Sequence, residues 1–137
     1  MTEVNIDDYT QLAVKTLEDI KQLYQELNER ILDYAEAEVK VEQTKSIIEQ
    51  KKSSMIVNGE ISGKNAEERA ANTWVAIPEY DELALREQAA RFTRASLEVA
   101  KNKLSSAKRQ HEFYLRMIDL AIYGAPTFTD LEEGQYE

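Results

Sequence analysis

The sequence predicts an all-α protein, an antiparallel hairpin of two long, coiled-coil-like helices joined by a structured connector. Among 137 residues there are only 4 glycines and 2 prolines, while the strong helix formers Ala, Glu, Lys, Leu and Arg are abundant. Apolar residues recur every seven positions in two long segments, a pattern of helices rather than of strands. We therefore place one hairpin domain over residues 1–124 and an acidic flexible tail over residues 125–137.

The first helix is expected from about Ile6 to about Val57. A row of apolar residues at seven-residue spacing is expected to face the partner helix: Ile20, Leu27, Tyr34, Val41, Ile48 and Met55. A second row is expected at Ala13, Leu17, Tyr24 and Ile31, and its later positions are polar, Glu38, Lys45 and Lys52. The apolar face should therefore narrow toward the end of this helix.

The connector, about residues 58–77, carries three local signals. Asn58-Gly59 is a turn dipeptide, and it predicts that Val57 and Ile61 pair as a tiny two-stranded ribbon. Asn65, followed three residues later by Glu68, predicts a short capped helix. Trp74, Val75 and Ile77 then form an apolar plug, in which Trp74 covers the end of the hairpin.

The second long helix is expected from about Pro78 to residue 123. Proline suits a first turn, and Glu79, Asp81 and Glu82 suit the positive end of the helix dipole. Two rows are expected to face the first helix, one of Leu83, Ala90, Leu97, Leu104, His111 and Ile118, and one of Thr93, Ala100, Ala107, Tyr114 and Ala121. Gly124 followed by Pro126 predicts the end of the helix.

Both helices also carry apolar residues outside these rows, at Leu12, Leu23, Leu32, Leu85, Phe92, Val99, Phe113 and Leu115. A hairpin gives each helix one neighbour, so further apolar faces predict self-association into a helical bundle. The net charge of −9 is also unevenly placed. Residues 1–57 carry 12 acids against 7 bases, while residues 84–122 carry 8 bases against 4 acids. An acidic helix is thus expected beside a basic one.

The composition argues against enzyme chemistry. Cysteine is absent, which excludes disulfides, thiolate metal ligands and cysteine nucleophiles. The one histidine, His111, lies in a predicted seam, where a buried and hydrogen-bonded role is expected. No cofactor motif or metal-ligand set is present, so we expect neither cofactor nor metal. The N-terminus does not resemble a signal peptide, and no stretch has the roughly 20 apolar residues of a membrane span. We expect a cytoplasmic protein.

The second helix offers one alternative function. Basic residues there are spaced to track a phosphate backbone, and the candidate nucleic-acid contacts are Arg91, Arg94, Lys101, Lys108 and Arg109. The overall acidity argues against this function. The acidic first helix and tail raise the opposite possibility, a surface that mimics nucleic acid.

The connector sequence from Gly59 to Arg69 resembles a "G-x-x-x-GKNAEER" motif found in small phage- and prophage-encoded helical proteins of unassigned function. The matching residues are Gly59, Gly63, Lys64, Asn65, Ala66, Glu67, Glu68 and Arg69. The resemblance covers the helix–connector–helix layout, although the motif itself is short. It implies a phage origin, in the cytoplasm of a host cell, and carries over no functional residue.

These observations favour a non-catalytic, phage-type binding protein that contacts a DNA-processing or defence factor of the host or phage. A hairpin needs only a few linking residues, and loops on rigid scaffolds often carry recognition. The candidate contacts are therefore in the connector: Asn58, Gly59, Lys64, Asn65, Glu68, Arg69 and Trp74. Nucleic-acid binding and a role as a virion structural or assembly component are the alternatives. A connector that only locks the end of the hairpin also fits the sequence.

Overall fold

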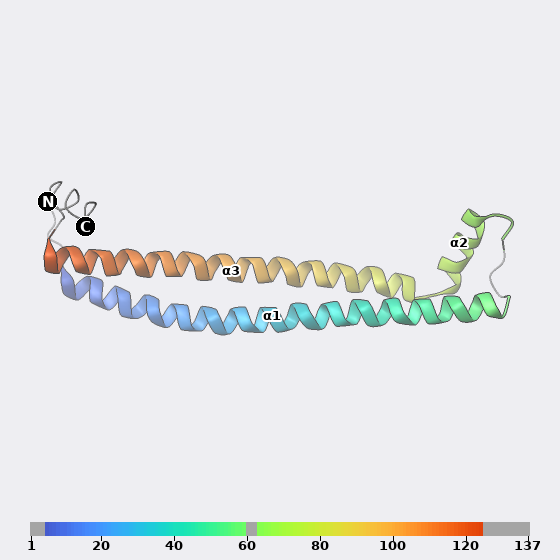
Figure 1. Ribbon diagram of the computed structural model, residues 1–137, viewed down its shortest axis with the longest axis horizontal. Helices are drawn as coiled ribbons and strands as arrows, with labels where there is room; N and C mark the ends of the chain where they lie inside the picture. The colour runs from blue at the N-terminus through green and yellow to red at the C-terminus, as the bar shows by residue number, and fades with distance from the viewer. Residues whose placement is uncertain (1–4, 60–62, 125–137) are drawn as a thin grey trace, which may run out of the picture. The chain divides into compact units, whose positions relative to one another are not determined.

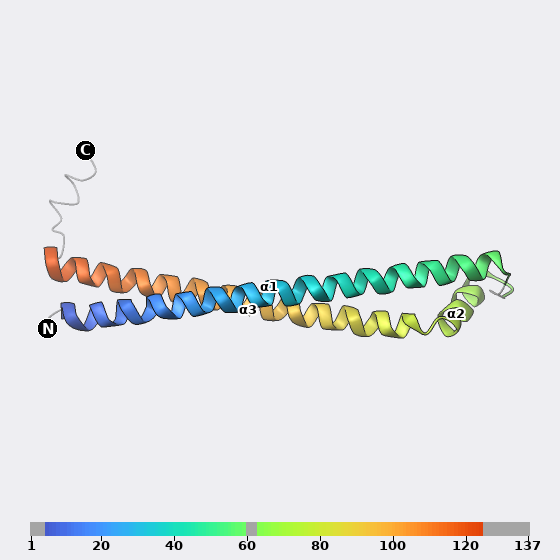
Figure 2. The ribbon, with the colours of Figure 1, turned by 90° about the horizontal axis from the view of Figure 1, so that it is seen from below.

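The computed structural model describes residues 5–59 and 63–124. Helix α1 spans Ile6–Val57, α2 spans Ala66–Ala76 and α3 spans Glu79–Tyr123. Helices α1 and α3 pack antiparallel, with the short α2 in the connection between them (Figure 1, Figure 2). The predicted all-α hairpin is confirmed. Contacts group the chain into two parts, which we describe separately: residues up to Leu27 with those from Ala100 on, and residues Asn28–Val99.

The helix ends follow local chemistry. Asn5 precedes α1, and its side-chain oxygen accepts a hydrogen bond from the Asp7 backbone N–H at 3.0 Å. Gly124 follows α3 with a positive φ of 78° and donates its N–H to the Leu120 carbonyl at 2.8 Å. The predicted stop at Gly124 is therefore confirmed. Pro126 and the predicted acidic tail lie outside the described residues.

In the part formed by residues 28–99, the predicted heptad rows supply the core. Val41 and Ile48 of α1 are buried, as is Leu97 of α3. Ile77, between α2 and α3, is fully buried with 0% of its surface exposed. The other part of the chain repeats this arrangement with Ala13 and Ile20 on α1, and Ala100 and Leu104 on α3. Both predicted rows of α3 are thus confirmed as its inward face.

The second row predicted for α1 is wrong. Leu17, Tyr24 and Ile31 are exposed, and Ala13 belongs to the first row. The structure instead turns inward the residues three positions after each first-row residue from Ala13 to Val41, and two of these are the buried threonines Thr16 and Thr44. Both threonine hydroxyls bond to backbone carbonyls of their own helix, Ala13 and Lys40 respectively. Their polarity is satisfied in this way, so the inward row did not need to be apolar.

Large apolar residues outside the two inward rows remain exposed. They include Leu12 and Leu32 on α1, and on α3 Leu85, Phe92, Val99, Phe113 and Leu115. Leu23 is the exception, since it lies in the inward row and is half-buried. These exposed side chains predict self-association, which the structure of a single chain does not test.

Candidate functional site at the connector

The start of α2 is built by reciprocal hydrogen bonds. Asn65 Oδ1 accepts from the Glu68 backbone N–H at 2.8 Å, and Glu68 Oε2 accepts from the Lys64 backbone N–H at 3.2 Å. This is the predicted capping box, with the glutamate reaching one residue further back than usual. Asn65 and Glu68 are therefore committed to holding α2, and their predicted role as partner contacts remains untested.

Two glycines set the path of the chain into α2. Gly59 has φ +67° and open space around its Cα, whereas Gly63 has φ +150°. A Cβ on Gly63 would lie 2.7 Å from the Arg69 backbone nitrogen. Only glycine permits this close approach. The predicted Val57–Ile61 ribbon is wrong at its first residue, because Val57 is the last residue of α1, while Ile61 lies outside the described residues.

The plug at the end of α2 is Ile77 rather than Trp74. Trp74 is 52% exposed and Val75 is 83% exposed, whereas Ile77 is completely buried. Trp74 lies flat on Tyr80, with ring centroids 4.6 Å apart and planes 15° apart. The sequence prediction erred because it ranked residues by size. Thr73 and Ile77 are four residues apart, so both face inward, whereas Trp74, one residue after Thr73, lies on the outer side.

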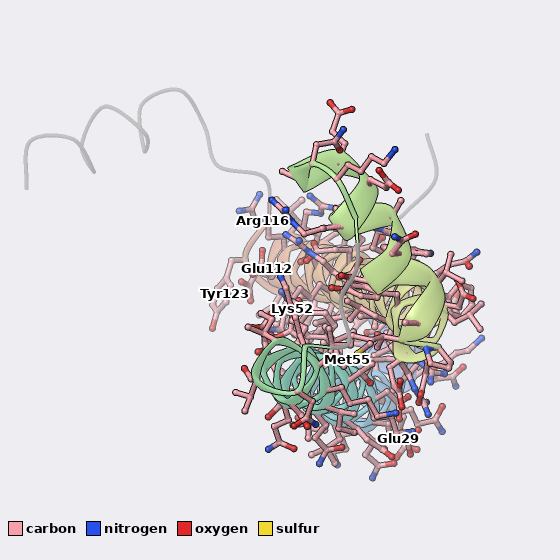
Figure 3. The ribbon with its side chains drawn as sticks, turned by 90° about the vertical axis from the view of Figure 1, so that its right-hand side faces the viewer. Glu29, Lys52, Met55, Glu112, Arg116 and Tyr123 are labelled. Carbon is pink, nitrogen blue, oxygen red and sulfur yellow. The ribbon has the colours of Figure 1, made fainter. Side chains whose placement is uncertain are left out.

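A groove of about 450 Å³ separates the last turns of α1 from α2. Its lining is largely apolar and carries two cationic side chains: Lys52, Met55, Ile56, Gly59, Ala66, Arg69, Ala70 and Thr73. Figure 3 shows Lys52 and Met55 on α1 beneath α2. An apolar trough with positive charge suits an apolar side chain that has a carboxylate beside it.

The structure brings only some of the predicted contact residues together. Gly59 and Arg69 line the groove, whereas Trp74 does not. Sequence reasoning missed Lys52, Met55, Ile56 and Ala70 as groove residues. Lys52 gave a signal, since it interrupts the apolar pattern near the end of α1, but only α2 makes it part of a groove.

Charge pairing between the long helices differs from the prediction that acidic α1 pairs with basic α3. In the part containing residues 100–124, Lys103 of α3 lies 3.8 Å from Glu26 of α1, as expected. In the other part the polarity is reversed, because Lys51 of α1 pairs with Glu79 of α3. This hydrogen bond from Lys51 is the main cause that lowers the pKa of Glu79 below its ordinary value of 4.5. Charge alone therefore does not specify the pairing.

Two of the candidate nucleic-acid contacts, Arg91 and Lys108, have protein neighbours of their own. In residues 28–99, Arg91 lines a groove together with Glu38, Glu42 and Glu87. In the part containing residues 100–124, the Lys108 ammonium lies 4.8 Å from the centroid of the Tyr24 ring. Acids beside Arg91 repel phosphate. These contacts weigh against nucleic-acid binding by Arg91 and Lys108.

His111 pairs with the buried Thr16. Its Nδ1 lies 2.8 Å from Thr16 Oγ1, and the same hydroxyl donates to the Ala13 carbonyl at 3.0 Å. A hydroxyl has a single proton, so when the Thr16 hydroxyl donates to the Ala13 carbonyl it accepts from a His111 tautomer that carries hydrogen on Nδ1. The predicted role of His111 as a hydrogen-bonded residue of the seam is confirmed, although it is half-buried rather than buried.

Across residues 5–59 and 63–124, no three His, Cys, Asp or Glu side chains gather closely enough to hold a metal ion. Within the same residues, no helix has the length and apolarity needed to cross a membrane. Comparison with protein-family models, curated proteins and solved structures yields no significant match to this chain.

Proposed function

We propose that this chain is a non-catalytic binding protein that captures a partner protein in the connector groove. The observation that carries the proposal is the groove itself, where Lys52 and Arg69 flank an apolar trough formed by Met55, Ile56 and Ala70. A groove with these properties selects an apolar side chain next to an acidic one on its partner.

The construction of the connector supports this use. Reciprocal capping at Asn65 and the buried Ile77 fix the two ends of α2, so the groove is held in place before a partner binds. A preformed site loses less conformational entropy on binding than a flexible one. The resemblance to phage-encoded proteins suggests a host or phage protein, such as a DNA-processing or defence factor, as the partner.

Photo-crosslinking tests the proposal. A photoreactive amino acid replaces Ala70, which is exposed on the groove wall, and in a control replaces Gln43, which is exposed on α1. In host lysate, the Ala70 variant is expected to form one dominant adduct that the Gln43 variant does not form. Arg69→Glu, placed in the Ala70 variant, should abolish the adduct. Identical adduct patterns at Ala70 and Gln43, or an adduct insensitive to Arg69→Glu, would overturn the proposal.

A further inference from the structure

Helix α3 carries a second heptad seam on its solvent side, within residues 28–99. Leu85, Ala89, Phe92, Ser96 and Val99 follow one another at alternating steps of four and three residues. Leu85 is 66% exposed and Phe92 is 73% exposed. At about 100° per residue, this seam lies about 110° around the helix from the rows that face α1. Such spacing suits a helix with two neighbours in a bundle.

We propose that this seam, hereafter the outer seam, binds the outer seam of a second copy of the chain in antiparallel orientation. The sizes along it are self-complementary. With the two-fold axis between residues 90 and 91, Phe92 of one copy packs on Ala89 of the other, and Leu85 packs on Ser96. The two largest side chains of the seam, Phe92 and Leu85, then each meet a small one, as close packing between helices requires, while Val99 at the end of the seam lies opposite Glu82.

Charge sets the orientation. Residues 79–90 of α3 carry four acids and one base, whereas residues 91–99 carry two bases and one acid. Antiparallel pairing places the acidic segment of one copy beside the basic segment of the other. Parallel pairing would place the four acids of each copy together, which is unfavourable. The charge distribution therefore selects the same orientation as the side-chain sizes.

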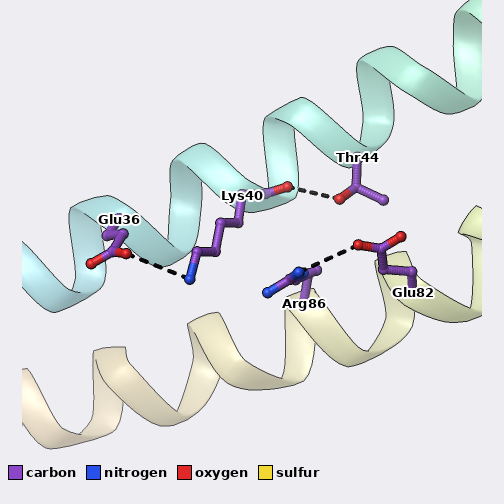
Figure 4. Close-up of polar contacts among 5 residues, drawn as sticks. All are labelled: Glu36, Lys40, Thr44, Glu82 and Arg86. Carbon is purple, nitrogen blue, oxygen red and sulfur yellow. Dashed lines mark hydrogen bonds and ion pairs between the residues drawn. The ribbon is translucent and has the colours of Figure 1, made fainter.

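The edge of the outer seam is already electrically balanced. On α3, Arg86 is 3.4 Å from Glu82, and on the facing side of α1, Lys40 is 3.5 Å from Glu36 (Figure 4). In the antiparallel pair, Arg86 would face Thr93 and Gln88 would face Ala95 across the flanks. No like charges oppose one another at these positions, so association desolvates no unpaired charge there.

Sedimentation velocity over micromolar to submillimolar concentration tests the association. The wild-type chain is expected to dimerise with rising concentration, whereas Phe92→Glu should remain monomeric. Leu32→Glu, at an equally exposed apolar position on α1, is the control and should dimerise like the wild type. Unchanged helical circular dichroism shows that each variant is folded. A monomeric wild type, or dimerisation of Phe92→Glu, would refute the outer seam as an interface.

Crosslinking through introduced cysteines tests the orientation, and because the chain has no native cysteine, only the introduced ones can react. Gln88→Cys and Ala95→Cys are made singly, and a short bismaleimide is added. Antiparallel pairing predicts that Ala95→Cys does not crosslink alone, whereas its mixture with Gln88→Cys does. In this register the two Gln88 positions lie about 7.5 Å apart along the axis and the two Ala95 positions about 13.5 Å apart, at about 1.5 Å per residue. Crosslinking of Ala95→Cys alone, or no crosslinking of the mixture, would overturn the proposal.

Discussion

Removal of the Ile77 side chain should destabilise the chain more than any other single truncation in the connector. Ile77 is fully buried, and its backbone N–H donates to Thr73 at 3.1 Å while its carbonyl accepts from Tyr80 at 3.2 Å. Ile77→Ala removes three carbons, worth about 2.4 kcal/mol at about 0.8 kcal/mol per methylene group. The cavity that remains raises the expected loss of unfolding free energy to about 3 to 4 kcal/mol.

Urea denaturation followed by circular dichroism and by Trp74 fluorescence measures this loss. Trp74 is the sole tryptophan and stacks on Tyr80, so its emission reports on the connector, while circular dichroism reports on all three helices. Val75→Ala is the matched control, because Val75 is 83% exposed and its truncation should cost less than about 0.5 kcal/mol. A loss below about 1 kcal/mol for Ile77→Ala, or equal losses for both variants, would refute the assignment of Ile77 as the plug.

Three further predictions follow from single contacts. Gly63→Ala should destabilise the connector more than Gly59→Ala, because only a Cβ at position 63 would clash with the backbone, at 2.7 Å from the Arg69 nitrogen. Urea denaturation followed by Trp74 fluorescence gives the midpoint of each variant, and equal midpoints would contradict the close approach. Thr16→Val should lower the unfolding free energy by about 1 to 2 kcal/mol, because it removes the hydrogen-bond partner of His111 Nδ1. Thr44→Val removes only a hydrogen bond to the Lys40 carbonyl of the same helix, so its loss of unfolding free energy should be smaller in the same assay. The lowered pKa of Glu79 predicts a stabilisation that is present above the ordinary carboxyl pKa of 4.5 and is lost as the pH falls through the lower pKa of the folded state. The difference in unfolding free energy between wild type and Lys51→Met should therefore shrink in acid. A constant difference across denaturation curves measured at several pH values would exclude the contribution of Glu79.

The long-range plan of the chain is readable from sequence because it depends on periodicity. Row positions such as Val41, Ile48, Leu97 and Leu104 are apolar every seven residues and are buried. The second row of α1 was misassigned because apolar Leu17 and Tyr24 follow the first row by four residues, while Thr16 follows it by three. A threonine can face inward when its hydroxyl is hydrogen-bonded to a carbonyl of its own helix, and a search for apolar residues at regular spacing misses such a position.

The groove was less accessible to prediction because it depends on where α2 lies. The capping pair Asn65 and Glu68 identifies where α2 begins, but no local signal states that Arg69 and Ala70 face the last turns of α1. Size misled the assignment of Trp74, since helical phase rather than bulk decides which side chain is buried. The sequence therefore locates the connector, but the residues that line its groove become identifiable only once the position of α2 is known.

The inward face of α1 is only partly apolar, and large apolar side chains lie outside it. With threonine at positions 16 and 44 of the inward row, α1 offers α3 less apolar surface than a uniformly apolar row would. Apolar side chains are instead found outside that row, and on α3 they include the outer seam with Phe92 at its centre. A hairpin that leaves this much apolar surface uncovered gains stability when a second copy covers it. Stability should therefore rise with protein concentration in the wild type and be independent of concentration in Phe92→Glu, a comparison that thermal denaturation at two concentrations makes directly.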